Sequence, residues 1–132
     1  MPHITIEHSD NLDPAHDLSR LAEELRRVAI ATGVFPEAGV RVRLVPCVHY
    51  AIADGHRDNG FAAALLRIGE GRDTATRARA AKAIHECLCA FFGRELEGGH
   101  FMVSTDLQVN EAAVSFKTNP VHARLARERG EG

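Results

Sequence analysis

The stretch FAAALLRI, at residues 61–68, predicts a β-strand that is buried on both sides, because almost no polar side chain lies on either face. The glycine-rich corner GEGR follows at residues 69–72, and Asp73 or Thr74 then offers a side-chain cap for a long helix. Apolar side chains recur along this helix with a helical period, at Ala78, Ala81, Ile84, Leu88 and Phe91 or Phe92.

The helix is expected to end at Gly98 and Gly99, and HFMVSTDLQV at residues 100–109 predicts a strand that returns beside the first one. A crossover helix brings its second strand back parallel to the first. Residues 61–110 are therefore predicted to form one βαβ unit.

The same order of elements occurs earlier in the chain. HITIEH at residues 3–8 alternates with the period of a half-buried strand, and Asp13 followed by Pro14 predicts a helix N-cap with proline in the first turn. Helical spacing follows at Leu18, Leu21, Leu25, Val28 and Ala29, before a stop at Gly33. VRVRLVPCVHYAIA at residues 40–53 predicts the returning strand, which Pro46 bends or ends.

We therefore predict an α/β fold built from a duplicated βαβ unit, with a four-stranded sheet and two helices on one of its faces. The single domain should span residues 1–123, with units at about 2–46 and 61–110 and then a C-terminal strand or arm segment. Residues 124–132, RLARERGEG, are expected to be a frayed polar tail. The other face of the sheet also carries apolar side chains, which should be buried in an interface. Neighbouring copies of the same chain are the simplest candidates for that interface, and a partner protein is the alternative.

Composition argues against several classes of function. The 132-residue chain has a formal net charge of −2 and 26% charged residues, so nothing favours nucleic acid or a membrane surface as a partner. No segment approaches the ~18 apolar residues of a membrane span and there is no signal-peptide pattern, which predicts a cytoplasmic protein. The three cysteines lack a C-x-x-C and the eight histidines lack an H-x-H or H-x-x-x-H pair, so we expect no disulfide framework and no metal site.

Pro2 follows Met1 at the mouth of the first strand, where a residue without an N–H is tolerated. It is either a strand starter or, if Met1 is removed, a terminal secondary amine, which no internal residue can supply. Arg41 and Arg43 alternate with apolar neighbours, so both project from one face of the strand. This pattern fits either a solvated polar face or a binding site. Arg72 lies at a strand-to-helix corner, where free backbone N–H groups suit anions.

Five segments taken together resemble the 5-carboxymethyl-2-hydroxymuconate isomerase family of the tautomerase superfamily. In chain order they are MPHITIEHSDN, ATGVFPEAGVR, IADG, RIGEGR and SFKTNPVHA, and they span nearly the whole chain. The resemblance implies two βαβ units per subunit, a homotrimer with its sheets around a central core, and no cofactor or metal. It also implies an isomerase that converts a 2-hydroxymuconate-type dienol to its conjugated 2-oxo isomer in aromatic-acid catabolism.

By the same resemblance, Pro2 is the catalytic general base once Met1 is lost, and Arg41 and Arg72 bind the carboxylates of a polycarboxylate substrate. Arg43 has a matching basic position whose role stays open. Two alternatives also stay open. One is a decarboxylase or hydratase of the same superfamily, and the other is a non-catalytic trimer that binds aromatic acids or a partner protein.

A proline amine accepts a proton only while it is neutral, so the protein must lower its pKa below that of an ordinary α-amine. Burial and a nearby positive charge both do so. A unit charge ~4 Å away supplies about 1 kcal/mol in water and about 4 kcal/mol in a partly desolvated site, so the charge must act in a pocket. We therefore expect Pro2 at the floor of an apolar cavity, which an adjacent subunit could complete, with Arg41 and Arg72 near its mouth.

Overall fold

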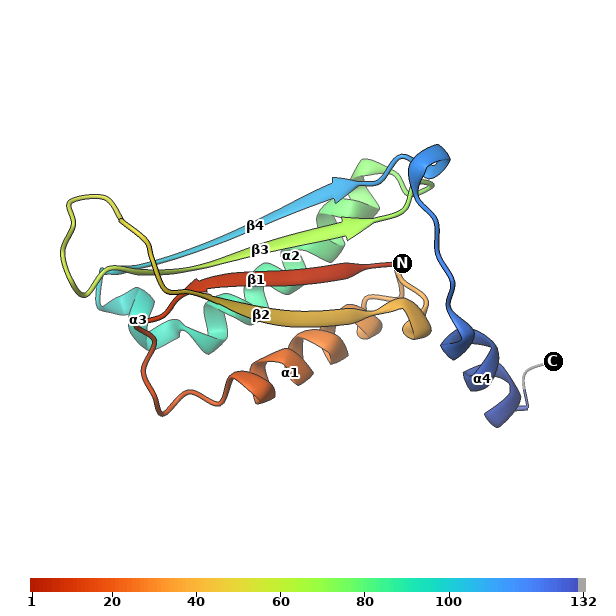
Figure 1. Ribbon diagram of the computed structural model, residues 1–132, viewed down its shortest axis with the longest axis horizontal. Coiled ribbons are helices and arrows are strands. Elements are labelled where there is room, and N and C mark those ends of the chain that lie inside the picture. Colours follow the sequence, from red (N-terminus) through yellow and green to blue (C-terminus); the bar gives the residue numbers. More distant parts are fainter. Residues whose placement is uncertain (131–132) are drawn as a thin grey trace.

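The computed structural model describes residues 1–130, which form one sheet with two long helices packed against one of its faces (Figure 1). The strands are β1 (His3–Ser9), β2 (Arg41–Cys47), β3 (Gly60–Ile68) and β4 (Phe101–Val109). Their order in the sheet is β2-β1-β3-β4. β2 is parallel to β1 and β4 is parallel to β3, whereas β1 and β3 are antiparallel. The predicted α/β fold with a duplicated βαβ unit is confirmed.

The core lies between the sheet and its helical layer. The helices are α1 (Leu18–Ala31), α2 (Thr74–Phe91), α3 (Gly93–Glu97) and α4 (Pro120–Glu128), with 3-10 helices η1 (Glu37–Gly39) and η2 (Ala112–Val114). Alternate side chains of the central strands point toward the helices, because successive residues of a strand face opposite sides. The buried apolar residues of β1 and β3 are Ile4, Ile6, Ala62, Ala64, Leu66 and Ile68. The helical layer supplies Leu21, Leu25, Ala29, Ala80, Ile84, Leu88 and Phe92, so both units share one core.

Helix α1 begins later than the sequence predicted. Its N-cap is Asp17, whose side chain accepts a hydrogen bond from the N–H of Arg20 at 3.1 Å. Asp13 belongs instead to a separate turn, where its carboxylate accepts from the N–H of Ala15 at 2.9 Å. Both aspartates bond backbone N–H groups a few residues ahead, so local sequence does not separate a turn from a helix cap.

Helix α2 begins as predicted but is shorter. Of the two expected caps the structure uses Asp73, whose carboxylate accepts from the N–H of Thr76 at 2.8 Å. The separate helix α3 follows α2, and the predicted stop at Gly98 and Gly99 ends α3 instead. Ala78, expected in the core, is exposed. The buried row of this helical segment is Ala80, Ile84, Leu88 and Phe92, spaced four residues apart.

The predicted frayed tail at residues 124–132 is wrong where the structure describes it. Helix α4 covers most of that segment, because Asn119 caps it by accepting from the N–H of Val121 at 3.0 Å. Arg129 then forms an ion pair with Glu37 of η1 at 2.5 Å. Residues 131 and 132 lie outside the described residues. Like every other helix of the described chain, α4 is too short or too polar to cross a membrane.

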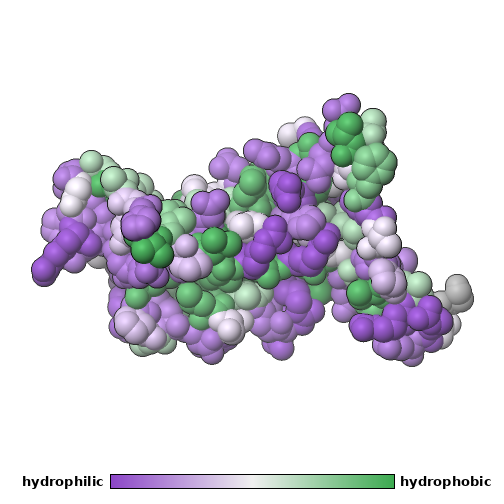
Figure 2. Space-filling view, in the orientation of Figure 1, coloured by the Kyte–Doolittle hydropathy of each residue, from purple (hydrophilic) through white to green (hydrophobic). Residues whose placement is uncertain are grey.

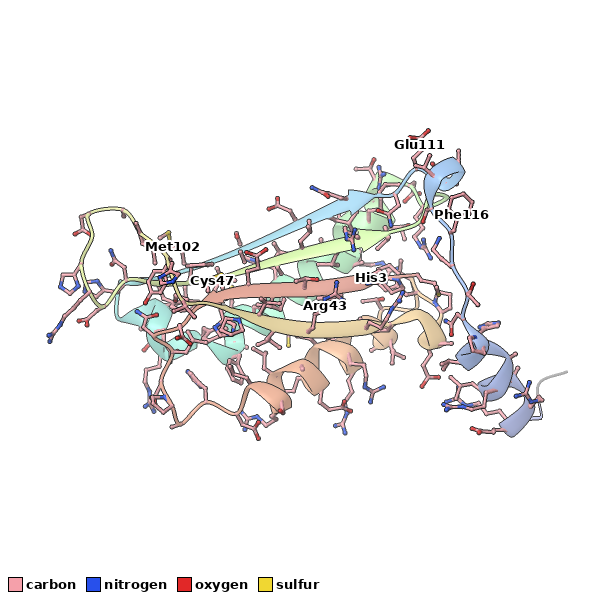
Figure 3. All side chains as sticks on the ribbon, in the orientation of Figure 1. His3, Arg43, Cys47, Met102, Glu111 and Phe116 are labelled. Carbon is pink, nitrogen blue, oxygen red and sulfur yellow. The ribbon has the colours of Figure 1, made fainter. Side chains whose placement is uncertain are left out.

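The face of the sheet that the helices leave open is mixed in character (Figures 2 and 3). Met102 of β4 is 49% exposed and Val45 of β2 is 41% exposed. Tyr50, from the loop after β2, lies edge-on to Phe61 with ring centroids 6.3 Å apart. Apolar side chains therefore remain on this face, as the sequence predicted, and they lie toward the end of the sheet that is remote from the N-terminus.

Replacing Asp17 by alanine should lower the free energy of unfolding by about 1 kcal/mol, because the N–H of Arg20 loses its acceptor. Urea denaturation followed by circular dichroism measures the change. Asp13→Ala is the matched control, since it removes a turn bond and no helix cap, and it should cost less. Equal costs would contradict Asp17 as the cap of α1.

Candidate active site

The first residue of β1 has a basic residue on either side of it. In the sheet register His3 lies opposite Arg41 of β2 and also opposite Arg67 of β3. Paired residues of neighbouring strands point to the same face of a sheet. Three nitrogen-bearing side chains therefore emerge together next to the start of the chain. Arg67 was missed at the sequence level, because its closeness to His3 depends on how β1 and β3 pair.

Pro2 is fully buried at the entrance of β1. Its carbonyl oxygen accepts a hydrogen bond from the N–H of Arg41 at 3.2 Å, which continues the ladder between β1 and β2. Proline has no N–H to offer, but at the first position of a strand this costs no ladder bond. The predicted site residues Pro2 and Arg41 are therefore direct neighbours in space.

The Met1 side chain has a close-fitting seat between η1 and the start of α4. A Cβ atom on Gly39 would lie 3.0 Å from Cγ of Met1, so a side chain at that position would force Met1 to shift. The amide nitrogen of Asn119 donates to Sδ of Met1 at 3.1 Å and to the carbonyl of Ala38 at 2.9 Å. Asn119 thereby ties the cap of α4 to both η1 and the beginning of the chain.

A cavity of about 400 Å³ opens beside the start of the chain. Its wall comprises Met1, His3, Arg41 and Arg67, together with residues of the segment 110–118 that follows β4. That segment contributes one cation, Lys117, one carboxylate, Glu111, and the exposed ring of Phe116 (Figure 3).

The expectation of an apolar cavity with Pro2 at its floor is wrong in two respects. The wall carries three fixed positive charges, from Arg41, Arg67 and Lys117, against the one carboxylate of Glu111, so it is polar and cationic. Pro2 is not part of this wall. It is buried one residue behind Met1, which occupies the position next to the cavity.

Arg72 is not part of the cavity wall either, and backbone carbonyls hold its guanidinium in place. Nε donates to the carbonyl of Val34 at 3.1 Å, and Nη1 donates to the carbonyl of Gly69 at 3.3 Å. The guanidinium also lies over the ring of Phe35, 5.3 Å from its centroid. These contacts fix the position of the positive charge without neutralising it, because neither a carbonyl nor a phenyl ring carries a net charge.

The pKa of the terminal amine is lowered from its ordinary value. Burial is the largest cause, followed by the positive charges of Lys117, Arg72 and Arg41, all of which disfavour an ammonium ion. Both predicted arginines therefore act electrostatically on the start of the chain. Lys117 acts with them, and sequence reasoning missed it although it lies within the quoted segment SFKTNPVHA. No local pattern marks this lysine, because it reaches the site only when residues 110–118 fold back.

Arg43, whose role the sequence left open, lies on the open face of the sheet next to His3 (Figure 3). Its Nη1 donates to Nδ1 of His3 at 3.3 Å. The pKa of His3 is lowered, first by burial and then by the charges of Arg41, Arg43 and Arg67. The neutral form of His3 is therefore favoured in the cavity wall, and Arg43 contacts its ring there.

The family that the chain matches is the 5-carboxymethyl-2-hydroxymuconate isomerase family, over residues 2–125. The curated 5-carboxymethyl-2-hydroxymuconate Delta-isomerase of Escherichia coli is 32% identical over 123 residues, which cover 93% of this chain and 98% of that protein. A solved 5-carboxymethyl-2-hydroxymuconate isomerase from Deinococcus radiodurans R1 has a TM-score of 0.87 at 31% identity, covering 94% of this chain and 93% of that one. These relatives are named as isomerases, which does not favour the decarboxylase, hydratase or binding-module alternatives.

A more distant solved structure, a fused 4-OT described as a wild-type symmetric trimer, has a TM-score of 0.65 at 18% identity. The likeness covers 92% of this chain and 98% of that one. At this identity it supports the fold alone, since one fold can carry several functions.

Replacing Lys117 by glutamine should raise the pKa of the terminal amine, because one charge that disfavours the ammonium form is removed. Titration of the ¹⁵N-labelled terminal amine by NMR measures the change. Lys82→Gln removes an equal charge from the exposed side of α2 and should leave this pKa unchanged. The same rise in both variants would mean that net charge alone, and not the site, sets the pKa.

Proposed function

Because the chain belongs to the 5-carboxymethyl-2-hydroxymuconate isomerase family and is an isomerase of the tautomerase superfamily, we propose that it acts on a 5-carboxymethyl-2-hydroxymuconate-type dienol. The product is the conjugated 2-oxo isomer. The observation that carries the proposal is the start of the chain beside a cationic cavity, where burial and then the charges of Lys117, Arg72 and Arg41 lower the pKa of the terminal amine of Met1. The names of the relatives support the choice of substrate class.

The catalytic group in this proposal is the nitrogen of Pro2, set free when Met1 is removed. Methionine is commonly removed when a small residue such as proline follows it. The seat that Met1 fills beside Gly39 and Asn119 then becomes space next to the new terminal nitrogen. That nitrogen begins one residue deeper than the amine of Met1, and Pro2 is fully buried while Met1 is in place. The positive charges of Lys117, Arg72 and Arg41, which lower the pKa of the Met1 amine after burial, also lie beside the new terminus and disfavour its protonation.

The reaction is one proton transfer in two steps. Neutral Pro2 takes the proton of the 2-hydroxyl group, and the oxygen–hydrogen bond electrons enter the conjugated system to give a dienolate. The protonated amine then returns the same proton to a distant carbon, where a carbon–hydrogen bond forms and the 2-oxo group is completed. The transfer needs no cofactor. Because one group both accepts and returns the proton, the pKa of that group must lie near the working pH.

The cations have two tasks in this proposal. Arg41 binds a substrate carboxylate, because its guanidinium is always charged and offers paired donors to a carboxylate. Arg67 and Lys117 in the same wall bind or attract a further carboxylate. Two N–H groups of Arg72 donate to carbonyls, which holds its guanidinium in place. In this proposal its other N–H groups bind the substrate, and its positive charge helps to lower the pKa of Pro2.

The proposed assembly is a homotrimer that covers the open face of the sheet. Val45, Tyr50 and Met102 leave apolar surface on this face, and contact with a second copy of the chain would remove it from water (Figure 2). The fused 4-OT of related fold is a trimer. An adjacent subunit could then also close the open side of the cavity.

We place the enzyme in the cytoplasm. Cys47, Cys87 and Cys89 are all free thiols in the described chain, which fits a reducing compartment.

Pro2→Ala should lower kcat about a hundredfold or more while the fold remains, because a primary amine replaces the positioned secondary amine. Ultraviolet absorbance of the dienol, which differs from that of the enone, follows the reaction. Intact mass gives the fraction of each preparation that lacks Met1. Turnover that does not track this fraction, or full turnover by the alanine variant, would remove Pro2 from the mechanism.

Met102→Asp should convert a trimer to single chains of 14.4 kDa, because it places a charge among the apolar side chains of the proposed interface. Light scattering after size exclusion measures the mass. Ala75→Asp adds the same charge to the exposed first turn of α2 and should leave the assembly intact. A wild-type protein that elutes as a monomer at all concentrations would contradict the trimer.

A further inference from the structure

A cluster of metal-ligating side chains lies at the end of the sheet opposite the cavity. His56 and Asp58 come from the loop between β2 and β3, and His100 directly precedes β4. This loop projects past the end of the sheet, away from the N-terminus (Figure 1). One ligand atom of each residue lies within 4.8 Å of the others. Spacing rules could not find the cluster, because His56 and His100 are distant in the sequence.

His100 has the tautomer that a metal ion needs. The amide nitrogen of Asn59 donates to the carbonyl of Ile52 at 3.2 Å and to Oδ1 of Asp54 at 2.8 Å. The amide oxygen of Asn59 is therefore left to accept from Nδ1 of His100 at 3.1 Å. With the proton on Nδ1, Nε2 keeps a free lone pair. Histidines that bind metal ions almost always donate their other ring N–H in this way.

His56 and Asp58 are already close to the separation of two ligands on one ion. Nδ1 of His56 and Oδ2 of Asp58 are 4.0 Å apart, and bonds of about 2.0–2.2 Å to a shared ion hold two ligand atoms within about 4 Å. Nδ1 of His56 accepts the N–H of Asp58 at 3.1 Å, a bond that coordination would replace. The rings of His56 and His100 are stacked with centroids 4.3 Å apart, so the two imidazoles already touch.

The backbone around these exposed side chains is well held. The N–H of Gly55 donates to the carbonyl of Ile52 at 2.8 Å, in a turn where Ala53 and Gly55 have φ of 48° and 79°. The N–H of Gly60 donates to the carbonyl of His100 at 2.9 Å, which ties the end of the loop to the start of β4. Ligands on fixed backbone positions lose less conformational entropy when an ion gathers them.

The neighbouring cavity is acidic, which favours a cation. Asp58 and His100 form part of the wall of a cavity of about 350 Å³, together with the carboxylates of Asp13 and Glu95. Within the described chain, neither lysine nor arginine lines it. Oε1 of Glu95 bonds His16 at 2.5 Å, whereas Oε2 is buried without a hydrogen-bond partner among the described residues. An unpaired carboxylate oxygen adds negative potential at short range.

We propose that His56, Asp58 and His100 bind one divalent transition-metal ion of the zinc type. Two imidazole nitrogens with one carboxylate oxygen suit zinc, cobalt, nickel and copper better than calcium or magnesium. Three protein ligands leave a further position for water. The ion fastens the loop between β2 and β3 to the start of β4, at the opposite end of the sheet from Pro2. The site therefore stands apart from the proposed isomerisation.

Isothermal titration of zinc chloride into untagged full-length protein tests the site, with cobalt chloride as the spectroscopic probe. The wild type should bind one ion per chain with saturation, and its melting temperature should rise with the metal concentration. Loss of an outer-shell partner of a metal costs about 10–100-fold in affinity, and loss of a ligand in His100→Ala or Asp58→Asn should cost at least as much. NMR shifts on metal addition should be confined to the loop and the start of β4.

His122→Ala is the matched control, because His122 is an exposed histidine on α4, remote from the cluster. It should leave the affinity unchanged. The proposal would be overturned if His122→Ala lost as much zinc affinity as Asp58→Asn, or if zinc binding by the wild type did not saturate. A thiolate-to-cobalt absorption band that disappears in Cys47→Ser would also overturn it, by placing the ion at a cysteine.

Discussion

Strand β1 is hydrogen-bonded on both sides, and this constraint buries the first residues of the chain. Pairing with β2 and with β3 makes it a central strand, so Pro2 at its entrance lies inside the protein and not at a solvated edge. The same two pairings set Arg41 and Arg67 on either side of His3. The antiparallel join of β1 to β3 also unites the two βαβ units, so fold and site depend on one set of backbone bonds.

The fold gathers four positive charges around the start of the chain. Arg41 comes from β2, Arg67 from the end of β3, Arg72 from the corner before α2, and Lys117 from the segment after β4. Like charges held close together repel one another until an anion binds between them. The same potential disfavours an ammonium ion at the chain terminus. In the proposed function, one field therefore both attracts the carboxylates of the substrate and keeps the base neutral.

The sequence predicted the strands and their duplication well, because alternation and turn residues are local properties that tertiary contacts did not override. Helix boundaries were less predictable, since Asp13 and Asp17 offer the same carboxylate to nearby N–H groups and only packing selects Asp17. The site was predictable as far as Arg41 beside Pro2. Lys117 and the pairing of His56 with His100 depend on how distant segments fold together, which no local pattern encodes.

The proposed isomerisation needs a neutral nitrogen at the start of the chain. ¹⁵N NMR of Met1-free protein labelled in proline can follow the nitrogen of Pro2 as the pH is changed. The nitrogen of Pro2 should have a pKa below that of the same amine in the denatured chain. This pKa should coincide with the pH at which kcat/KM falls on the acid side, because the protonated amine cannot accept a proton. A nitrogen that stays fully protonated across the pH range of turnover would contradict the proposed isomerisation.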